Sequence, residues 1–238
     1  MTMQLTDEQV ETYRRDGVLP LGEVLDTEVV EVAREHLDQL REDEHIDNPS
    51  EASGKDTFRR LEVSRVDPWF MSLVTRDSIV GPATSILGPN VQYFQDNVFW
   101  KPANTGAPSP WHQDQTWWKA NPPNMATIWI ALDDTDDDNG AVQYIPGSHH
   151  HFIDPPKAED GGDGLLLNPD DIDKTNAVSF NLPAGHAVMH HCLTVHGSPA
   201  NESDRPRRGY TVHLQQAGLL GHSTEHCSLL AGEMPAEC

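Results

Sequence analysis

The chain has 238 residues, with 16 Lys and Arg against 38 Asp and Glu, which gives a formal net charge of −22. This length fits one substantial domain, and we expect a single domain over residues 1–238 rather than two independent enzymatic domains. An acidic surface repels phosphate groups, so the composition argues against nucleic acid and membrane partners. The acidity fits adaptation to high salt and an ordinary acidic cytosolic protein equally well, and the sequence leaves both open.

No segment of the sequence predicts insertion into a membrane or export. The longest apolar run, near Ala126–Leu132, is far shorter than the roughly 20 residues that a spanning helix needs. The first thirty residues are rich in Asp and Glu and contain no apolar core with basic flanks, so we expect no secretory signal. The three cysteines are widely spaced, which argues against a disulfide framework. We therefore expect a cytoplasmic protein with reduced thiols.

The first ninety residues are predicted to be a mostly helical cover. Thr6 and Gln9 fit a capping box that begins a short helix, and Gly17 ends it. A second helix is predicted from near Asp26, because apolar residues recur there at helical spacing. Residues 42–55 are predicted to be a loop, and residues 67–87 to form two short helices.

From Val91 onward the sequence consists of short β-rich runs separated by Pro, Gly and Asn. Strands are predicted at 91–100, 111–114, 125–132, 141–145, 177–182, 187–190, 194–196 and 209–215. Short strands that follow helices, rather than alternate with them, predict a mainly β fold with an antiparallel jelly roll over residues 91–216. Residues 149–176 are too long for a hairpin and predict a lid-like insertion. Residues 217–238 are predicted to be a loosely docked tail.

His112 and Asp114 form the first pattern that indicates a metal site. Residues i and i+2 of a strand point to the same face, so an imidazole and a carboxylate would project together. A third ligand on a distant strand would complete two His and one carboxylate around an iron, with positions left for oxygen and a chelating cosubstrate. Alone, the triplet is a weak signal.

Further segments supply the context: Trp111-His112-Gln113-Asp114, Leu132-Asp133-Asp134 through Asn139-Gly140-Ala141, Ile145-Pro146-Gly147-Ser148-His149, and His196-Gly197-Ser198 with Asn201 and Arg207. With these segments in this order, residues 4–216 resemble the phytanoyl-CoA dioxygenase family of Fe(II)- and 2-oxoglutarate-dependent oxygenases. The resemblance implies a double-stranded β-helix, a cupin-like jelly roll with the metal in its mouth. It also implies Fe(II) as cofactor, and 2-oxoglutarate and O2 as cosubstrates.

Residue by residue, the resemblance implies that His112, Asp114 and His196 bind the iron and form the catalytic centre. It implies that Arg207, eleven residues after the distal His, holds the far carboxylate of 2-oxoglutarate, because a guanidinium fork matches a carboxylate. The neighbouring Arg208 competes for this role.

Other candidate residues surround this centre. Ser198, Trp129 and Asn97 occupy positions that line the cosubstrate pocket in relatives. Trp117 and Trp118 follow the metal-binding segment directly and are expected to line the substrate entrance.

Several remaining motifs are better explained by structure than by chemistry. His149 ends the family's Pro-Gly-Ser-His turn, where a structural hydrogen bond is expected, and His190-His191 alternate faces. Cys192 is expected to be a small buried hydrophobe. The acidic segment 134–140 resembles a calcium loop but has its glycine at the seventh position and lacks the closing Glu, so it predicts a hairpin connection.

The resemblance implies an enzyme that hydroxylates a small organic molecule at an unactivated carbon, with release of succinate and CO2. It implies hydroxylation rather than halogenation, since chlorinating relatives have Ala or Gly where this chain has Asp114. Two alternatives stay open: a metal-binding cupin that serves as a sensor or structural protein, and a cupin isomerase or hydrolase without 2-oxoglutarate. Arg207 and Ser198 argue against the first. The sequence shows no Lys/Arg cluster suited to CoA, which favours an uncharged, zwitterionic or cationic substrate, and it does not indicate the oligomeric state.

Overall fold

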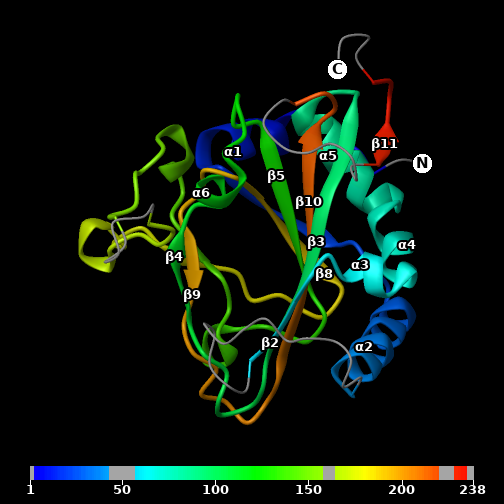
Figure 1. Ribbon diagram of the computed structural model, residues 1–238, viewed down its shortest axis with the longest axis vertical. Helices are drawn as coiled ribbons and strands as arrows, with labels where there is room; N and C mark the ends of the chain where they lie inside the picture. Colours follow the sequence, from blue (N-terminus) through cyan, green and yellow to red (C-terminus); the bar gives the residue numbers. More distant parts are fainter. Residues whose placement is uncertain (1–2, 43–56, 158–163, 220–227, 235–238) are drawn as a thin grey trace.

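Two antiparallel sheets face each other, and helices cover the outer side of the larger sheet (Figure 1). The computed structural model describes residues 3–42, 57–157, 164–219 and 228–234. The larger sheet has seven strands in the order β1-β8-β5-β10-β3-β11, with β2 also paired to β3, and the smaller has four in the order β4-β9-β6-β7. The mainly β fold with N-terminal helices and a jelly-roll core is therefore confirmed.

The elements follow one another with helices concentrated before β3. The helices are α1 (Asp7–Asp16), α2 (Thr27–Glu42), α3 (Val63–Val66), α4 (Met71–Val74), α5 (Asp77–Leu87) and α6 (Gln115–Trp118), with short 3-10 turns at η2 (Pro68–Phe70), η3 (Asp137–Asn139), η4 (Ser148–His150) and η5 (Pro169–Asp171). The strands are β1 (Val18–Glu23), β2 (Phe58–Leu61), β3 (Val91–Lys101), β4 (Ser109–His112), β5 (Met125–Ala131), β6 (Gln143–Tyr144), β7 (Val178–Ser179), β8 (His186–His191), β9 (His196–Ser198), β10 (Arg207–Gln216) and β11 (Leu229–Ala231).

The first two helices form as their sequence predicts. The side chain of Thr6 accepts from the Gln9 amide, the Gln9 side chain accepts from the Thr6 amide, and Gly17 ends α1 in the left-handed conformation at φ 72°. A side chain at Gly17 would collide with His149 and Thr194. The apolar face of α2 is buried through four residues: Val30, Ala33, Leu37 and Leu40.

Alternation along the central strands separates a helix-facing side from an interior side. On β3, Val98 and Trp100 pack in the main core, whereas Asn97 pairs with Thr211 of β10 on the opposite side. Every residue of β5 is buried, because both of its faces are covered.

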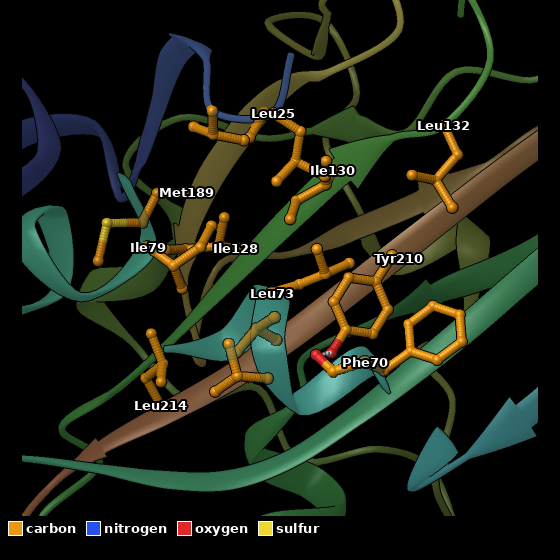
Figure 2. Packing of buried hydrophobic residues seen from close by; sticks show 14 of the residues in the cluster. Leu25, Phe70, Leu73, Ile79, Ile128, Ile130, Leu132, Met189, Tyr210 and Leu214 are labelled. Carbon is orange, nitrogen blue, oxygen red and sulfur yellow. Dashed lines mark hydrogen bonds between the residues drawn. The ribbon is translucent and has the colours of Figure 1, made fainter. Parts of the chain in front are cut away.

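The main core lies between the larger sheet and the helices (Figure 2). Ile128 and Ile130 of β5 point into it, and Tyr210 of β10 packs against Phe70, with ring centroids 5.2 Å apart. This layer stiffens the strands whose interior side carries the candidate site.

Three expectations about segment boundaries need correction. The N-terminal cover also supplies two strands of the larger sheet, β1 and β2. The tail contributes β11, which pairs with β3. The predicted strand 111–114 ends at His112, since Asp114 has helical dihedrals (φ −55°, ψ −32°) at the start of α6. Between residues 67 and 87 the chain forms the two predicted helices, α4 and α5, preceded by the 3-10 turn η2.

Parts of three predicted segments lie outside the described residues. They are residues 43–56, which hold nearly all of the predicted loop, residues 158–163 within the predicted lid-like insertion, and residues 220–227 and 235–238 of the predicted tail. The closing role of the insertion stays a prediction. In the part of the chain that the structure covers, no helix is both long enough and apolar enough to cross a bilayer.

Candidate active site and metal centre

The pairing of β4 with β9 brings the two histidines of the predicted triad together. His112 is the register partner of His196, and their ring centroids lie 4.2 Å apart. Asp114 joins them from the first residue of the turn into α6, with its Oδ1 3.7 Å from the Nε2 atom of each histidine. The predicted triad is assembled, although the strand geometry expected to align His112 with Asp114 is not what does so.

Backbone carbonyls fix the tautomers of both histidines. The Nδ1 atom of His112 lies 2.7 Å from the carbonyl of Pro110, and that of His196 lies 2.9 Å from the carbonyl of Thr194. Since a carbonyl only accepts, each Nδ1 carries the hydrogen and each Nε2 presents a lone pair to the other ligands. Burial lowers the pKa of His112 and of His196 to about 4, so both rings are neutral near pH 7.

Asp114 completes the set as an ionised carboxylate. Its Oδ2 accepts from the hydroxyl of Thr127 at 3.0 Å and from Nε2 of His190 at 3.2 Å, which leaves Oδ1 directed at the triad. Burial opposes ionisation, but His196 and His190 outweigh it and hold the pKa of Asp114 well below its usual range.

The donor set fits a metal ion. The three ligand atoms of His112, Asp114 and His196 all lie within 4.8 Å of one another, and this is the one such group of His, Cys, Asp and Glu found in the described chain. None of the three atoms carries a proton, so their mutual repulsion is relieved by a cation between them. Two imidazoles and one carboxylate are the ligands of non-heme Fe(II) sites, which keep other coordination positions open.

A buried guanidinium lies beside this centre. Arg207, only 2% exposed, donates from Nε and Nη2 to the carbonyl of Gly140 at 3.1 and 2.7 Å, and its Cζ lies 5.1 Å from the centroid of the Trp129 ring. A Cβ on Gly209 would lie 2.4 Å from Trp129, so the glycine makes room for that ring. Burial lowers the pKa of Arg207 to about 10, yet no ion pair of the described residues includes it. An unpaired buried cation favours an anionic ligand.

Lys101 is a second basic side chain in the same place, and sequence reasoning missed it. It is the register partner of Arg207, and its Nζ donates to Oγ of Ser198 at 2.7 Å and to the carbonyl of Pro199. Burial, with Arg207 nearby, lowers the pKa of Lys101 to about 6. Counting alternate residues from Asn97 along β3 would have placed Lys101 on the interior side. Arg207, Lys101 and Ser198 together can receive a carboxylate.

The register separates Arg207 from its competitor. Arg208 points to the helix-facing side, where it binds the Asp133 carboxylate through Nε and Nη2 at 2.9 and 2.8 Å and lies over Trp100. Its charge is already matched, so the geometry favours Arg207 for the pocket.

The remaining sequence-predicted residues are divided. Trp117 is 42% exposed and meets His112 edge-on, with ring centroids 4.9 Å apart, which agrees with a place at the entrance. Trp118 is not at the entrance: it is 5% exposed and packs against Phe94 and His213. Asn97 lies on the interior side and bonds to Nε2 of His213 at 2.8 Å.

Arg59 of β2 adds another positive charge on the interior side. It pairs with Phe99, and its Cζ lies 4.9 Å from the centroid of that ring. Its charge acts on both His112 and Asp114. Sequence reasoning missed it because β2 follows the segment predicted as a loop.

The motifs assigned to structure behave accordingly. Nε2 of His149 bonds to the carbonyl of Arg14 at 3.1 Å, and Cys192 is buried, which raises its pKa to about 12. In the acidic connection the Asp136 side chain caps the turn η3.

The fold, the triad and the buried Arg207, unpaired within the described chain, together are those of a metal-dependent oxygenase that uses an anionic cosubstrate. Residues 13–209 match the family Phytanoyl-CoA dioxygenase (PhyH), and the chain belongs to that family. It is an Fe(II)- and 2-oxoglutarate-dependent oxygenase.

Characterised relatives agree with this class. The chain is 32% identical over 217 residues to the L-proline trans-4-hydroxylase of Streptomyces griseoviridis, covering 82% of this chain and 81% of that protein. It is 31% identical to an ectoine dioxygenase of Streptomyces coelicolor, covering 81% of this chain and 72% of the relative. Among solved structures, the epimerase SnoN from nogalamycin biosynthesis, in complex with Fe3+ and alpha ketoglutarate, superposes with a TM-score of 0.75 at 26% identity, covering 92% of this chain and 86% of that one.

Proposed function

We propose that the protein hydroxylates a small organic molecule at an unactivated carbon and converts 2-oxoglutarate to succinate and CO2. His112, Asp114 and His196 would hold Fe(II), and Arg207 with Ser198 and Lys101 would hold the far carboxylate of 2-oxoglutarate. One observation carries the proposal: three unprotonated ligand atoms lie beside a buried guanidinium that has no carboxylate partner in the described chain.

The chain's own residues bind and orient the cosubstrate and the substrate, and they shield the site from water. The bound metal and cosubstrate supply the activation of O2. Arg207 places a buried positive charge, and Lys101 a buried hydrogen-bond donor, where the far carboxylate ends, which orients the cosubstrate toward the triad. Trp129 lines this pocket and excludes water from it, since the ring is buried against Arg207. Trp117 beside His112 contacts the substrate at the open side of the centre.

A zwitterionic small molecule with a carboxylate is the substrate class that we propose. Arg59 supports this choice, because its charge lies on the interior side and acts on the residues of the triad. The relatives named for L-proline and ectoine support it as well. A net charge of −22 supports a protein without nucleic acid partners, and the three widely spaced cysteines support a reducing compartment such as the cytoplasm.

The reaction class is tested on the anaerobic Fe(II) protein. Addition of 2-oxoglutarate should produce a visible charge-transfer band, which neither a structural cupin nor a cupin isomerase would show. Absence of the band in iron-loaded protein would contradict the proposed function.

The substrate class is tested by succinate release from a panel of amino acids and other small zwitterions, with CoA thioesters included. Turnover of CoA thioesters alone would overturn the substrate class and leave the reaction class intact. The products, analysed by mass spectrometry after reaction in molar chloride, should be oxygenated and free of chlorine, because Asp114 occupies a ligand position.

A further inference from the structure

Behind the ligand set, a line of buried polar side chains runs from Asp114 across the larger sheet. Thr127 Oγ1 lies 3.0 Å from Oδ2 of Asp114 and 2.8 Å from Nδ1 of His213, and Nε2 of His213 lies 2.8 Å from Nδ2 of Asn97. The three residues belong to β5, β10 and β3, which are neighbours in the sheet. None of them is placed to bind the metal.

The direction of every hydrogen bond in this line follows from the carboxylate. An ionised carboxylate only accepts, so the hydroxyl of Thr127 donates to Asp114 and can receive at its oxygen only from a donor. Nδ1 of His213 must therefore carry the hydrogen, which leaves its Nε2 as an acceptor. Asn97 must then present its NH2 group to that nitrogen. The opposite order would set two lone pairs against each other between Thr127 and Asp114.

His190 fixes the same oxygen from β8. Its Nε2 carries the hydrogen donated to Oδ2 of Asp114, and its Nδ1 has no hydrogen-bond partner among the described residues. Thus two donors from two strands hold Oδ2, and Oδ1 is left for the metal.

We propose that Thr127, oriented by His213 and Asn97, is a positioning residue that keeps Asp114 a one-oxygen ligand of the metal. The inference rests on the proposed metal site and adds residues that act on it from behind. Both oxygens of a carboxylate can bind a metal, and the second would occupy a position that the cosubstrate or O2 needs. Two hydrogen bonds to Oδ2 oppose that second contact.

The position of Asp114 in the chain explains why such support is required. Asp114 begins a four-residue helix and lies outside any strand, so the sheets do not set its side-chain direction. The supporting residues lie on the central strands of the larger sheet and are themselves buried. Hydrogen bonds in such a dry environment are stronger than in water, and partners of metal ligands commonly fix ligand orientation.

The test compares Thr127→Val, which keeps the shape and removes the hydroxyl, with Thr127→Ser, which keeps the hydroxyl. Affinity for Co(II) is measured by titration in the absence of 2-oxoglutarate. We expect Thr127→Val to bind Co(II) about 10- to 100-fold more weakly, the usual effect of removing a partner of a metal ligand. The loss should not exceed this range, because His190 still holds the carboxylate. Thr127→Ser should stay within about 3-fold of the native protein, well short of that range.

The Co(II) absorption spectrum gives a readout that a loss of stability does not mimic. A carboxylate that binds through both oxygens raises the coordination number, so the ligand-field bands of Thr127→Val should weaken, whereas those of Thr127→Ser should match the native protein. Native affinity and native bands in Thr127→Val would overturn the proposal.

A double-mutant cycle tests whether His213 acts through Thr127. His213→Phe should weaken Co(II) binding in the native background and have no further effect in the Thr127→Val background. Equal losses of Co(II) affinity in both backgrounds would show that His213 does not act through Thr127 and would overturn the proposal. If His213→Phe is too unstable to purify, Asn97→Leu replaces it in the same cycle. If the native protein itself binds no Co(II) or Fe(II), the proposed function fails; if it binds them and Thr127→Val is unchanged, only this inference fails.

Discussion

The larger sheet carries a buried carboxylate network on each of its two sides. Asp96 and Asn97 are adjacent on β3, but Asp96 faces the helices whereas Asn97 faces the interior and joins the line that ends at Asp114. Both Asp96 and Asp114 are buried and accept several hydrogen bonds. The two carboxylates are therefore both buried and both bonded to residues of the larger sheet, and they differ in their donors.

On the helix-facing side the donors are neutral groups. Asp96 accepts from the hydroxyls of Tyr210 at 2.7 Å and Tyr93 at 2.9 Å, and from the amide and hydroxyl of Ser64. Burial raises the pKa of Asp96, although these bonds oppose the rise. Since Ser64 belongs to α3, the network fastens that helix to the sheet, next to the Tyr210–Phe70 packing that Figure 2 shows.

On the interior side the groups around the carboxylate are imidazoles, together with the hydroxyl of Thr127. His196, His190 and His213 lower the pKa of Asp114 despite its burial. A carboxylate whose neighbours are hydroxyl donors is stable without a metal ion. A carboxylate whose neighbours include the unprotonated nitrogens of two imidazoles forms a site that a metal cation stabilises. The nature of the donors, more than burial, separates the structural carboxylate from the functional one.

The largest expected effect comes from the interior side. His196→Ala should lower iron-dependent turnover by at least about 100-fold, since even partners behind a ligand can cost that much. The fold should persist, because the packed core lies on the other side of the sheet. Succinate release and thermal unfolding of the same preparation measure the two; near-native turnover would remove His196 from the ligand set.

Adjacent arginines on β10 give a matched pair for the two sides. Arg207→Ala should raise the 2-oxoglutarate concentration for half-maximal turnover by about 10- to 100-fold, because charge-assisted hydrogen bonds contribute about 1.5 to 3 kcal/mol. Arg208→Ala should leave that concentration unchanged and lower stability, since the Asp133 carboxylate then keeps only Arg34 as an ion-pair partner among the described residues. A larger cosubstrate effect in Arg208→Ala would mean that the register of β10 is wrong.

Asp96→Asn tests the helix-facing network alone. The amide would turn its NH2 toward hydroxyl or amide donors that need acceptors, so the free energy of unfolding should fall by about 1 to 3 kcal/mol. Co(II) affinity should be native, because the interior side is untouched. Urea unfolding measures the free energy of unfolding, and Co(II) titration measures the metal affinity. Weakened metal binding would show that the two networks are coupled through the sheet.

The sequence predicted much of this arrangement. Alternating strands, the capping box at Thr6 and the triad were all visible, because each depends on local spacing or on segments that match the family. Arg207 could be preferred over Arg208 for the same reason. The triad was found even though Asp114 lies past the end of its strand, since the order of the family segments carried the assignment.

What the sequence could not predict depends on cross-strand register. Thr127, His213 and His190 meet at Asp114 only because β5 pairs with β10 on one side and β8 on the other. Trp118 was expected at the entrance, but the short helix α6 turns it into the core and leaves Trp117 outside. Trp117 and Trp118 are adjacent and chemically identical, and the course of the backbone decides which of them is buried. Spacing along the chain does not reveal that course.

The smallest expected effect is that the stability contributed by Asp96 and the stability contributed by Asp114 change with pH in opposite directions. The folded-state pKa of Asp96 is raised above the usual 3.8, so its contribution to stability is present below that pH and is lost as the pH rises through the folded-state pKa. The pKa of Asp114 is lowered, so its contribution is present above 3.8 and is lost as the pH falls through the folded-state pKa.

Urea unfolding of metal-free protein, with chelator present, measures both contributions between about pH 2.5 and 6, a range that brackets the usual carboxyl pKa. The native protein's stability relative to Asp96→Asn should decline on going up from pH 3.8, and its stability relative to Asp114→Asn should decline on going down from it. Each slope is at most about 1.4 kcal/mol per pH unit, the limit for one proton. Burial lowers the pKa of His112, His196 and His213 and Asp114 opposes that fall, so the Asp114→Asn comparison reports the carboxylate together with these rings. Two slopes of the same sign would show that burial alone sets both carboxylates, and that the imidazoles on the interior side do not distinguish them.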